Sequence, residues 1–397
     1  LGQRTLTDED IEKLTQALDG NTKLRELNLR GNSFGSKAIR QVAVVLEGRT
    51  GIQSLNLSVN NCGDSGASLL ADALRVNNTL TSLDLLSNSI CAHGAASIGM
   101  ALKSNSTLLQ LSLGKNEIGD KGMRLISEAL QHDIPLVELD VDCCSLQYEG
   151  VRTLSEALVS NSHLTKLNLN GNKIGDNGAA ALAEALKQNQ AITELDLGSG
   201  EIGAQGAVSL SNGLSENASL TILRLACNMI GNAGVARLSE VISASNRTIC
   251  EIGLECNPIT GTFISQLADV LDCNVARIEG RAPRKDIQSL AIPVLHGESI
   301  EHKENQKVVA ESVEKIRPKD RLICEVLVEL GIDASNGQGG AQLASDAAVD
   351  KAGHADLQSD SPPAKVVREA LIEDMLSDIG VRESCRRVQR GGSRRRV

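Results

Sequence analysis

The chain has 397 residues and a formal net charge of −10, from 40 Lys and Arg residues against 50 Asp and Glu residues. Aromatic residues make up 1% of it, while hydrophobic residues make up 41%. This apolar fraction argues against disorder over most of the length, but the core must be built without large rings. The acidic charge disfavours nucleic acid as a partner of the main body, and no apolar run approaches the roughly 20 residues of a membrane span.

Residues 1–23 are predicted to contain a helix, because Leu14 and Leu18 stand one helical turn apart. The two leucines match the helix positions of the units that follow, but no strand pattern accompanies them. We therefore expect this segment to be either an N-terminal cap or the remainder of a further unit that begins upstream.

Residues 24–278 are predicted to form nine similar units, which recur every 28 residues and once after 29. Each reads LxxLxLxx[NC] or a close variant, as in LRELNLRGN at 24–32 and LTKLNLNGN at 164–172. The alternating apolar residues predict a short strand with one buried face, and the Asn is expected to satisfy backbone groups of neighbouring turns. A Gly and two apolar residues one turn apart then predict a helix packed closely against the stack.

This repeat resembles the leucine-rich repeat family, and its long period resembles the ribonuclease-inhibitor-like class of that family. The resemblance implies an α/β solenoid, or horseshoe, with a parallel sheet on the concave face and helices outside. It does not imply a particular function, because one repeat architecture serves many unrelated proteins.

The residues that flank the buried strand positions are predicted to form the solvent-facing side of the sheet, which is the candidate binding surface. They are mostly uncharged or mixed in the early units and acidic in the middle and late units, where two cations interrupt the acidic ridge. A basic protein partner with salt-sensitive association fits this charge; the alternative is a solvated sheet face without a ligand. The candidates are Glu138, Asp140, Asp142, Lys166, Glu194, Asp196, Arg224, Glu251 and Glu255.

The sequence predicts no catalytic site, cofactor, metal site or small-molecule substrate. Glu138, Asp140 and Asp142 lie close together, but on a regular sheet they are solvated neighbours rather than an acid–base pair. The ten Cys residues show no CxxC spacing and no His cluster beside them, and no GxxxxGK[ST] phosphate loop occurs.

The cysteines indicate the compartment, because ten thiols without a secretory signal favour a reducing cytoplasm. Cys227 and Cys256 occupy the same position of consecutive units, where parallel strands lie about 4.8 Å apart, within reach of a disulfide. Two reduced thiols are the simpler interpretation. Cys144 is expected only to replace the Asn of its repeat. Five N-x-[ST] sequons are attributed to chance in an Asn-rich chain: Asn56, Asn77, Asn105, Asn217 and Asn246.

Beyond residue 278 the periodicity stops. We predict polar helices over 279–332, a disordered linker over 333–363, a short amphipathic helix over 364–381 and an Arg-rich tail over 382–397. The tail is the one segment suited to RNA or another anionic partner.

Two segments of this region, 321–332 and 370–381, align without gaps, and each predicts an amphipathic helix that needs a partner. They are interpreted as duplicated docking helices; packing on each other or capping the repeats is the alternative. The candidate contact residues are Leu322, Leu327, Leu371 and Leu376.

The sequence as a whole predicts a non-catalytic scaffold that binds a protein through the concave strand face and the C-terminal helices. The resemblance leaves two alternatives. One is a Ran-type GTPase-activating protein, although these typically carry a strongly acidic block after the repeats and this chain has mixed charge there. The other is the repeat portion of a larger innate-immune-receptor-like protein, or of a ciliary or cytoskeletal one. A cytoskeletal or ciliary location is therefore compatible with the cytoplasmic prediction.

Overall fold

The computed structural model describes residues 6–48 and 50–283. The predicted linker, the amphipathic helices with Leu322, Leu327, Leu371 and Leu376, and the Arg-rich tail lie outside these residues. Within the described part, no helix combines the length and the apolar character that a membrane crossing requires.

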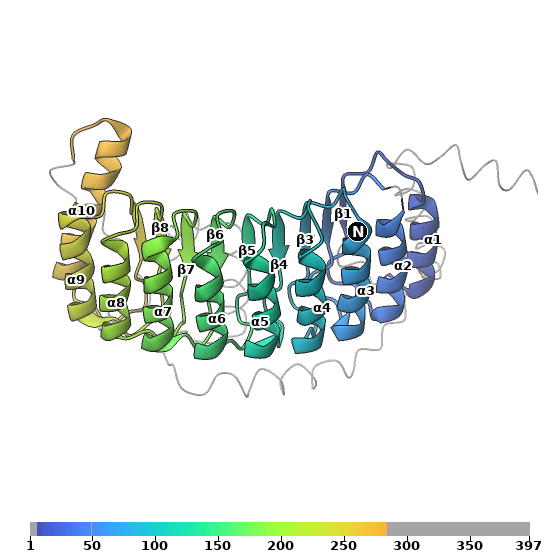
Figure 1. Cartoon of the computed structure of the whole chain (residues 1–397), viewed down its shortest axis with the longest axis horizontal. Helices are drawn as coiled ribbons and strands as arrows, with labels where there is room; N and C mark the ends of the chain where they lie inside the picture. The colour runs from blue at the N-terminus through green and yellow to red at the C-terminus, as the bar shows by residue number, and fades with distance from the viewer. Residues whose placement is uncertain (1–5, 49, 284–397) are drawn as a thin grey trace, which may run out of the picture. The chain divides into compact units, whose positions relative to one another are not determined.

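Ten helices alternate with nine short strands along the described residues (Figure 1). The strands are β1 (Glu26–Asn28), β2 (Ser54–Asn56), β3 (Ser82–Asp84), β4 (Gln110–Ser112), β5 (Glu138–Asp140), β6 (Lys166–Asn168), β7 (Glu194–Asp196), β8 (Ile222–Arg224) and β9 (Glu251–Gly253). The helices are α1 (Asp8–Leu18), α2 (Ser36–Glu47), α3 (Gly63–Val76), α4 (Ala92–Leu102), α5 (Gly119–Leu130), α6 (Tyr148–Leu158), α7 (Gly175–Gln188), α8 (Ala204–Leu214), α9 (Gly231–Ala244) and α10 (Gly261–Glu279).

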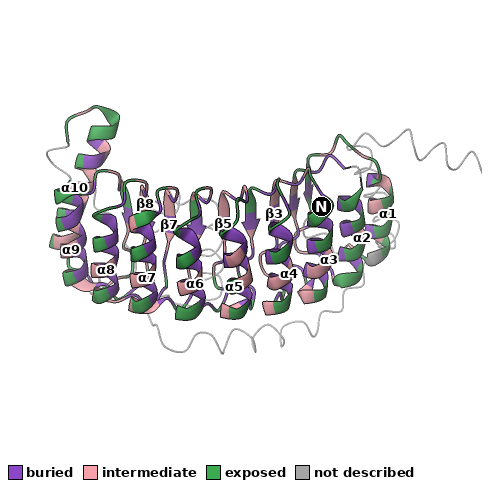
Figure 2. Ribbon diagram, viewed as in Figure 1, coloured by how far each residue is buried: buried purple, intermediate pink, exposed green. Residues whose placement is uncertain are grey.

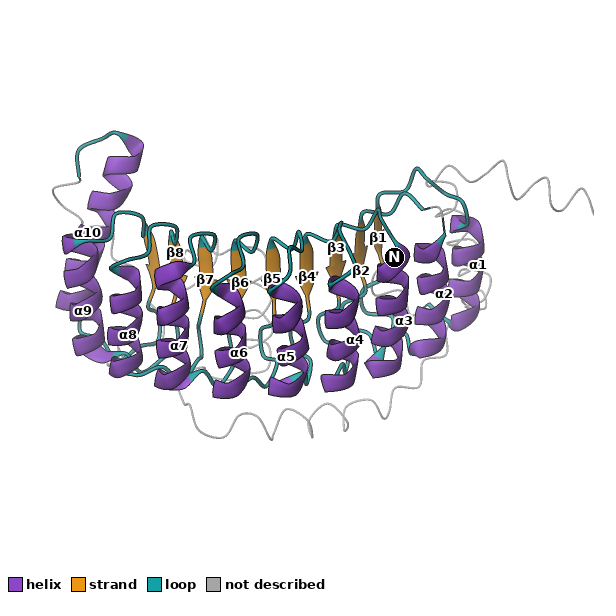
Figure 3. Cartoon of the chain, viewed as in Figure 1, coloured by secondary structure: helices purple, strands orange, loops and turns teal. Residues whose placement is uncertain are grey.

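All nine strands form one parallel sheet in chain order, with the helices in a second row beside it (Figure 3). Each strand residue pairs with the residue 28 positions later in the next strand, as Glu26 does with Ser54. Between β8 and β9 the offset is 29, so that Ile222 pairs with Glu251. Helices need about 10 Å each and parallel strands about 4.8 Å, so the sheet takes the inner, concave side of the stack. This confirms the predicted leucine-rich-repeat solenoid.

The core lies between the two rows and is built from aliphatic side chains, as Figure 2 shows by the buried residues of strands and helices. The fifth unit is representative: Leu139 and Val141 from the strand segment meet Leu154 and Leu158 of α6, all 0–1% exposed. Phe34 occupies a core position that Ile or Leu fills in most other units. The core of each unit is enclosed by the units before and after it in the stack. Aliphatic side chains fit this limited space more readily than aromatic rings do.

A row of buried Asn side chains closes the strand ends, as predicted; we call it the strand-end ladder. In Asn116, Nδ2 donates to the carbonyl oxygens of Leu85 at 2.9 Å and Leu113 at 2.7 Å. Its Oδ1 accepts from the N–H groups of Asn88 at 2.8 Å and Ile90 at 3.0 Å. Each Asn therefore ties its own turn to the preceding unit. The members are Asn32, Asn60, Asn88, Asn116, Asn172, Asn228 and, partly exposed in the last unit, Asn257.

A second row of buried Asn side chains, which we call the helix-end ladder, follows the helices and was not predicted. In Asn189, Nδ2 donates to the carbonyl oxygen of Leu158 at 2.7 Å, and Oδ1 accepts from the N–H groups of Ala191 and Ile192. It satisfies the helix C-terminus of the preceding unit, where carbonyls lack intrahelical partners. The members are Asn77, Asn105, Asn161, Asn189, Asn217 and Asn246.

Four of the five sequons belong to the helix-end ladder, so they recur for a structural reason and not by chance, while the interpretation that they are not glycosylation sites agrees with their burial. The Ser or Thr two residues on accompanies the turn that the Asn side chain makes, as when the Thr79 N–H donates to Asn77 Oδ1 at 3.0 Å. The Asn77 amide nitrogen that a glycan would need is buried and donates to the Leu46 carbonyl oxygen at 2.7 Å.

The loops that lead from strand to helix alternate between two forms, so the structural repeat is a pair of units. In one form the loop ends in a left-handed Gly, such as Gly63 at φ 58° or Gly119 at φ 59°. In the other, an Asp from the preceding unit caps the helix: Asp176 Oδ1 accepts from the N–H groups of Gly203 at 2.7 Å and Gly206 at 2.9 Å. The sequence period had indicated a single kind of unit.

Candidate protein-binding face

The predicted binding residues lie in three columns that run across the sheet, which together we call the strand face. The columns hold the first residue of each strand, the third residue, and the residue two positions after the strand. In the β5 unit these are Glu138, Asp140 and Asp142, all partly exposed, while Leu139 between the first two is fully buried. Because neighbouring strands are in register, side chains of one column lie side by side.

The third-residue column also has a structural role, which the repeat pattern alone does not predict. Where this residue is Asn or Asp, its Oδ1 accepts the backbone N–H two residues later and so closes an Asx turn. Asp140 Oδ1 does so with the Asp142 N–H at 3.1 Å, and Asp196 Oδ1 with the Gly198 N–H at 2.9 Å. An Asn makes the same bond in β6, from Asn170 N–H to Asn168 Oδ1 at 3.0 Å. The turn needs the oxygen but not the charge.

Ion pairs link four predicted residues across β6 to β9, and we call this row the charge ladder. Glu194 lies 3.2 Å from the Lys166 Nζ and 3.8 Å from the Arg224 guanidinium. The same guanidinium lies 3.6 Å from Glu251. Lys166 and Arg224 therefore pair with the acidic residues beside them, so this part of the face carries alternating charge. Such half-exposed pairs contribute at most about 1 kcal/mol each.

Further acidic side chains lie on the β5 unit and on β7: Glu138, Asp140 and Asp142 in the β5 unit, with Asp196 on β7 close enough to act on Asp142, form what we call the acidic centre. Glu138 Oε2 accepts from Gln110 Nε2 at 3.0 Å, and Asp140 Oδ2 accepts from Ser112 Oγ at 3.3 Å. These partners are neutral, so they orient the carboxylates without cancelling their charge.

Asp142 is the least satisfied carboxylate of the acidic centre. Its Oδ1 is buried and has no hydrogen-bond partner among the described residues. Burial raises the pKa of this carboxyl, and the charge of Asp196 adds to the rise, although Lys115 and a hydrogen bond with Asp140 oppose it. The side chain lies over Gly114, where an added Cβ would stand 1.6 Å from Oδ1. The Gly in the preceding unit is thus what makes room for this acid.

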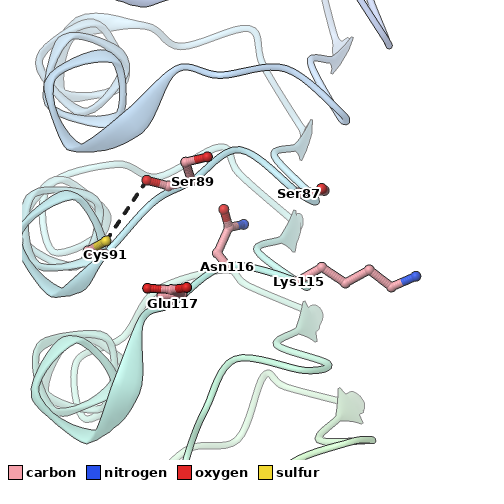
Figure 4. Close-up of a pocket in the computed structure, with 6 residues that line it drawn as sticks. All are labelled: Ser87, Ser89, Cys91, Lys115, Asn116 and Glu117. Atoms are coloured by element: carbon pink, nitrogen blue, oxygen red, sulfur yellow. Dashed lines mark hydrogen bonds between the residues drawn. The ribbon is translucent and has the colours of Figure 1, made fainter. Parts of the chain in front are cut away.

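A small hollow of about 240 Å³ lies beside the face, between the loops that follow β3 and β4 (Figure 4). Asn116, which lines it, belongs to the strand-end ladder, and the Cys91 thiol donates to the Ser89 carbonyl oxygen at 4.0 Å. Lys115 extends away from the other labelled side chains. The hollow is smaller than the roughly 300 Å³ at which ligand pockets begin. No group of three or more His, Cys, Asp or Glu suited to a metal ion occurs within 6–48 and 50–283.

Comparison with known proteins supports the repeat assignment. A family model described as Leucine Rich repeat matches residues 20–41, 104–127, 160–183, 188–211 and 216–239. Together with the parallel sheet, these matches support a leucine-rich repeat protein; the ribonuclease-inhibitor-like class stays a prediction. No curated protein matches the chain.

Two solved structures are similar to parts of this chain. One is titled Leiomodin-1 Actin-Binding Site 2, with 22% identity over 41% of this chain and 78% of that one, at a TM-score of 0.28. The other is a Caenorhabditis elegans tropomodulin C-terminal domain, with 14% identity over 47% of this chain and 95% of that one, at a TM-score of 0.34. At these TM-scores, neither likeness carries an argument about function.

Proposed function

We propose that this chain is a non-catalytic scaffold that binds a basic protein segment across the strand face, centred on β5. The observation that carries the proposal is Asp142, a partly buried carboxylate among acidic neighbours, one oxygen of which has no hydrogen-bond partner in the part of the chain that the structure describes. Unsatisfied buried polar groups cost free energy and are concentrated at functional sites. A Lys or Arg side chain from a partner would supply both the missing hydrogen and the opposite charge.

The shape of the face favours an extended protein segment over a small molecule. The three columns run along an open sheet, and the adjacent hollow is small. No Trp occurs in the chain, and the face carries no Tyr or Phe, so it lacks the large anchors that dominate tight interfaces. We therefore expect modest affinity with a strong dependence on salt.

The C-terminal amphipathic helices are proposed as a second contact. Their leucines, Leu322, Leu327, Leu371 and Leu376, lie outside the described residues, so their part in binding rests on the sequence alone. Two equivalent docking helices on one chain would raise avidity for a partner with two sites. The Ran-type activity and the receptor-like or ciliary assignments remain alternatives to this proposal.

The test neutralises the three acids of the acidic centre that belong to the β5 unit, with residues that the chain already uses in the same columns. Glu138→Gln copies Gln110, Asp140→Asn copies Asn168, and Asp142→Asn copies Asn170. This triple variant should keep the fold while losing three negative charges. The control removes the same charge from exposed positions away from the strand face: Glu12→Gln, Glu47→Gln and Glu216→Gln.

Binding of an Arg- and Lys-rich peptide is measured by fluorescence anisotropy at low and high salt. We expect the acidic-centre variant to bind about tenfold more weakly than the wild type at low salt, and the control to lose much less. Equal losses in the two variants, or wild-type binding that does not respond to salt, would contradict the proposal.

A further inference from the structure

Two thiols stand side by side where the last two strands end. Cys227 and Cys256 are both exposed and unbonded, and each occupies the position just before the strand-end ladder. The register that pairs Arg224 with Gly253 carries on to them, because the Cys227 N–H donates to the Glu255 carbonyl oxygen at 2.7 Å. The backbone therefore holds the two residues next to each other.

The local geometry suits a bond between the two sulfur atoms. Cys227 and Cys256 share the same left-handed conformation, with φ of 55° and 56°, so their side chains leave the backbone in parallel directions. Adjacent parallel strands are about 4.8 Å apart, and disulfides span Cα separations of about 4.4 to 6.8 Å. Burial raises the pKa of Cys227, and the neighbouring Cys256 adds to the rise, in keeping with the adjacent placement of the two residues.

No other neighbouring units of the described repeats place two Cys residues in this column. The column holds Gly31, Val59, Ser87, Lys115, Cys143, Gly171, Ser199, Cys227 and Cys256. Cys143 lies between Lys115 and Gly171, so it has no thiol beside it in the column. Burial raises the pKa of Cys62 and Cys144 to about 12, which leaves those core thiols protonated and inert.

We propose that Cys227 and Cys256 form a reversible modification site, a dithiol that closes to a disulfide across two repeats when it meets a low-molecular-weight disulfide such as oxidised glutathione. The thiolate of one Cys attacks a sulfur of the oxidant, forms a mixed disulfide and releases one thiol. The thiolate of the other Cys then attacks the protein sulfur and expels the second thiol. Two protons and two electrons leave the protein, and the oxidant is reduced to two thiol molecules.

A disulfide between Cys227 and Cys256 would join the last two units of the described sheet. Within residues 6–48 and 50–283, β9 pairs with one strand only, so the ninth unit has one fewer neighbour to stabilise it than the inner units have. A bond from Cys227 to Cys256 closes a loop that starts in β8's unit and ends in β9's unit, and so ties the last strand to the stack. The inference stands independently of the binding proposal, because it involves none of the acidic centre.

The raised pKa of Cys227 sets the expected pH dependence of closure. Since the thiolate is the attacking species, a raised pKa leaves less of it at neutral pH. The rate of closure should therefore increase as pH rises above neutrality.

The experiment treats the full chain with oxidised glutathione, blocks remaining thiols, and maps disulfides by mass spectrometry after proteolysis. We expect a cross-linked peptide joining Cys227 to Cys256 that disappears on reduction. Cys227→Ser and Cys256→Ser should each abolish it and leave a glutathione adduct on the remaining Cys. Ser87 and Ser199 occupy the same column, so these substitutions should be tolerated.

Cys143→Ser is the matched control, because it removes an exposed thiol from the same column but not from the pair. The cross-link should form in this variant as in the wild type. A chain that gains only glutathione adducts, a cross-link that joins other cysteines, or loss of the cross-link in Cys143→Ser would each overturn the proposal.

Discussion

The strand-end ladder and the strand face use the same residue types a few positions apart, yet they tolerate change very differently. The ladder is Asn in seven of nine units, while the first strand column runs through Glu, Ser, Gln, Lys and Ile. Asn116 is 2% exposed and bridges two units with both ends of its amide. Asn168 is partly exposed and closes one local turn. A side chain that is buried between repeats and bonds to both of them must be Asn, whereas the exposed positions of the strand face accept several residue types.

Asn116→Ala should have the largest effect on stability. It removes the donor to the carbonyls of Leu85 and Leu113, and the acceptor for two backbone N–H groups in the preceding unit. These buried groups would lose their partners, so we expect the free energy of unfolding to fall by about 3 kcal/mol. Asn168→Ala, which breaks one turn on the face, should cost less than about 1 kcal/mol. Chemical denaturation measures both.

Equal losses for Asn116→Ala and Asn168→Ala would mean that bridging between units is not what distinguishes the ladder from the face. A loss of stability in Asn116→Ala alone would show that the hydrogen bonds of Asn116 between two units are what require Asn at this position.

The arrangement of strands and helices was predictable because periodicity reports which positions are buried. Leu139, Leu154 and their counterparts recur at fixed offsets, and stacking the units places them in one core. The helix-end ladder was not found, although Asn77, Asn105, Asn161, Asn189 and Asn217 recur in the sequence. Periodicity does not say which carbonyl a side-chain amide reaches. That contact depends on how the turn after one helix approaches the helix of the preceding unit.

The candidate face was predictable as a set of columns but not as a set of partners. The sequence placed Glu194, Lys166 and Arg224 on the face, and the structure adds that the cations pair with Glu194 and with Glu251. A signal was present for one pair, since Lys166 and Glu194 occupy one column in consecutive units, whereas Arg224 reaches Glu194 and Glu251 from a different column. No sequence pattern predicts that Asp142 Oδ1 is buried, because its burial depends on the space that Gly114 leaves.

Cys144→Asn should have a smaller effect, and in the stabilising direction. Cys144 replaces the ladder Asn, and its thiol donates to the Leu113 carbonyl oxygen at 3.2 Å. It offers no oxygen to the preceding unit, whereas Asn172 Oδ1 accepts from both Cys144 and Leu146 N–H groups at 3.0 Å. Restoring Asn supplies that acceptor, and we expect a gain of about 1 kcal/mol in the free energy of unfolding.

The control for Cys144→Asn is Cys143→Ser, an exposed change one residue away that should leave stability within about 0.5 kcal/mol. A destabilised Cys144→Asn protein would show that this slot has adapted to the thiol, so that the ladder position no longer accepts the residue found in seven other units.

Asp142→Asn should give the smallest effect and the one most specific to the face. The folded state raises the pKa of this carboxyl above its ordinary value of 3.8. A raised folded pKa means that the protonated form favours folding, so this contribution is present in acid and is lost as pH rises through the folded pKa. The Asn variant should therefore gain stability relative to the wild type between about pH 3 and neutrality, by less than about 1 kcal/mol because the side chain is partly exposed.

Denaturation of both proteins across this pH range measures the difference, with Asp72→Asn on the exposed side of α3 as the control. A pH-independent difference for Asp142→Asn would mean that burial does not strain this charge. If the difference follows pH, the wild type holds a carboxylate that its own fold disfavours. A cationic partner would then stabilise the charged form of Asp142 on binding. The carboxylate that the fold disfavours most would therefore contribute most to the attraction of the partner.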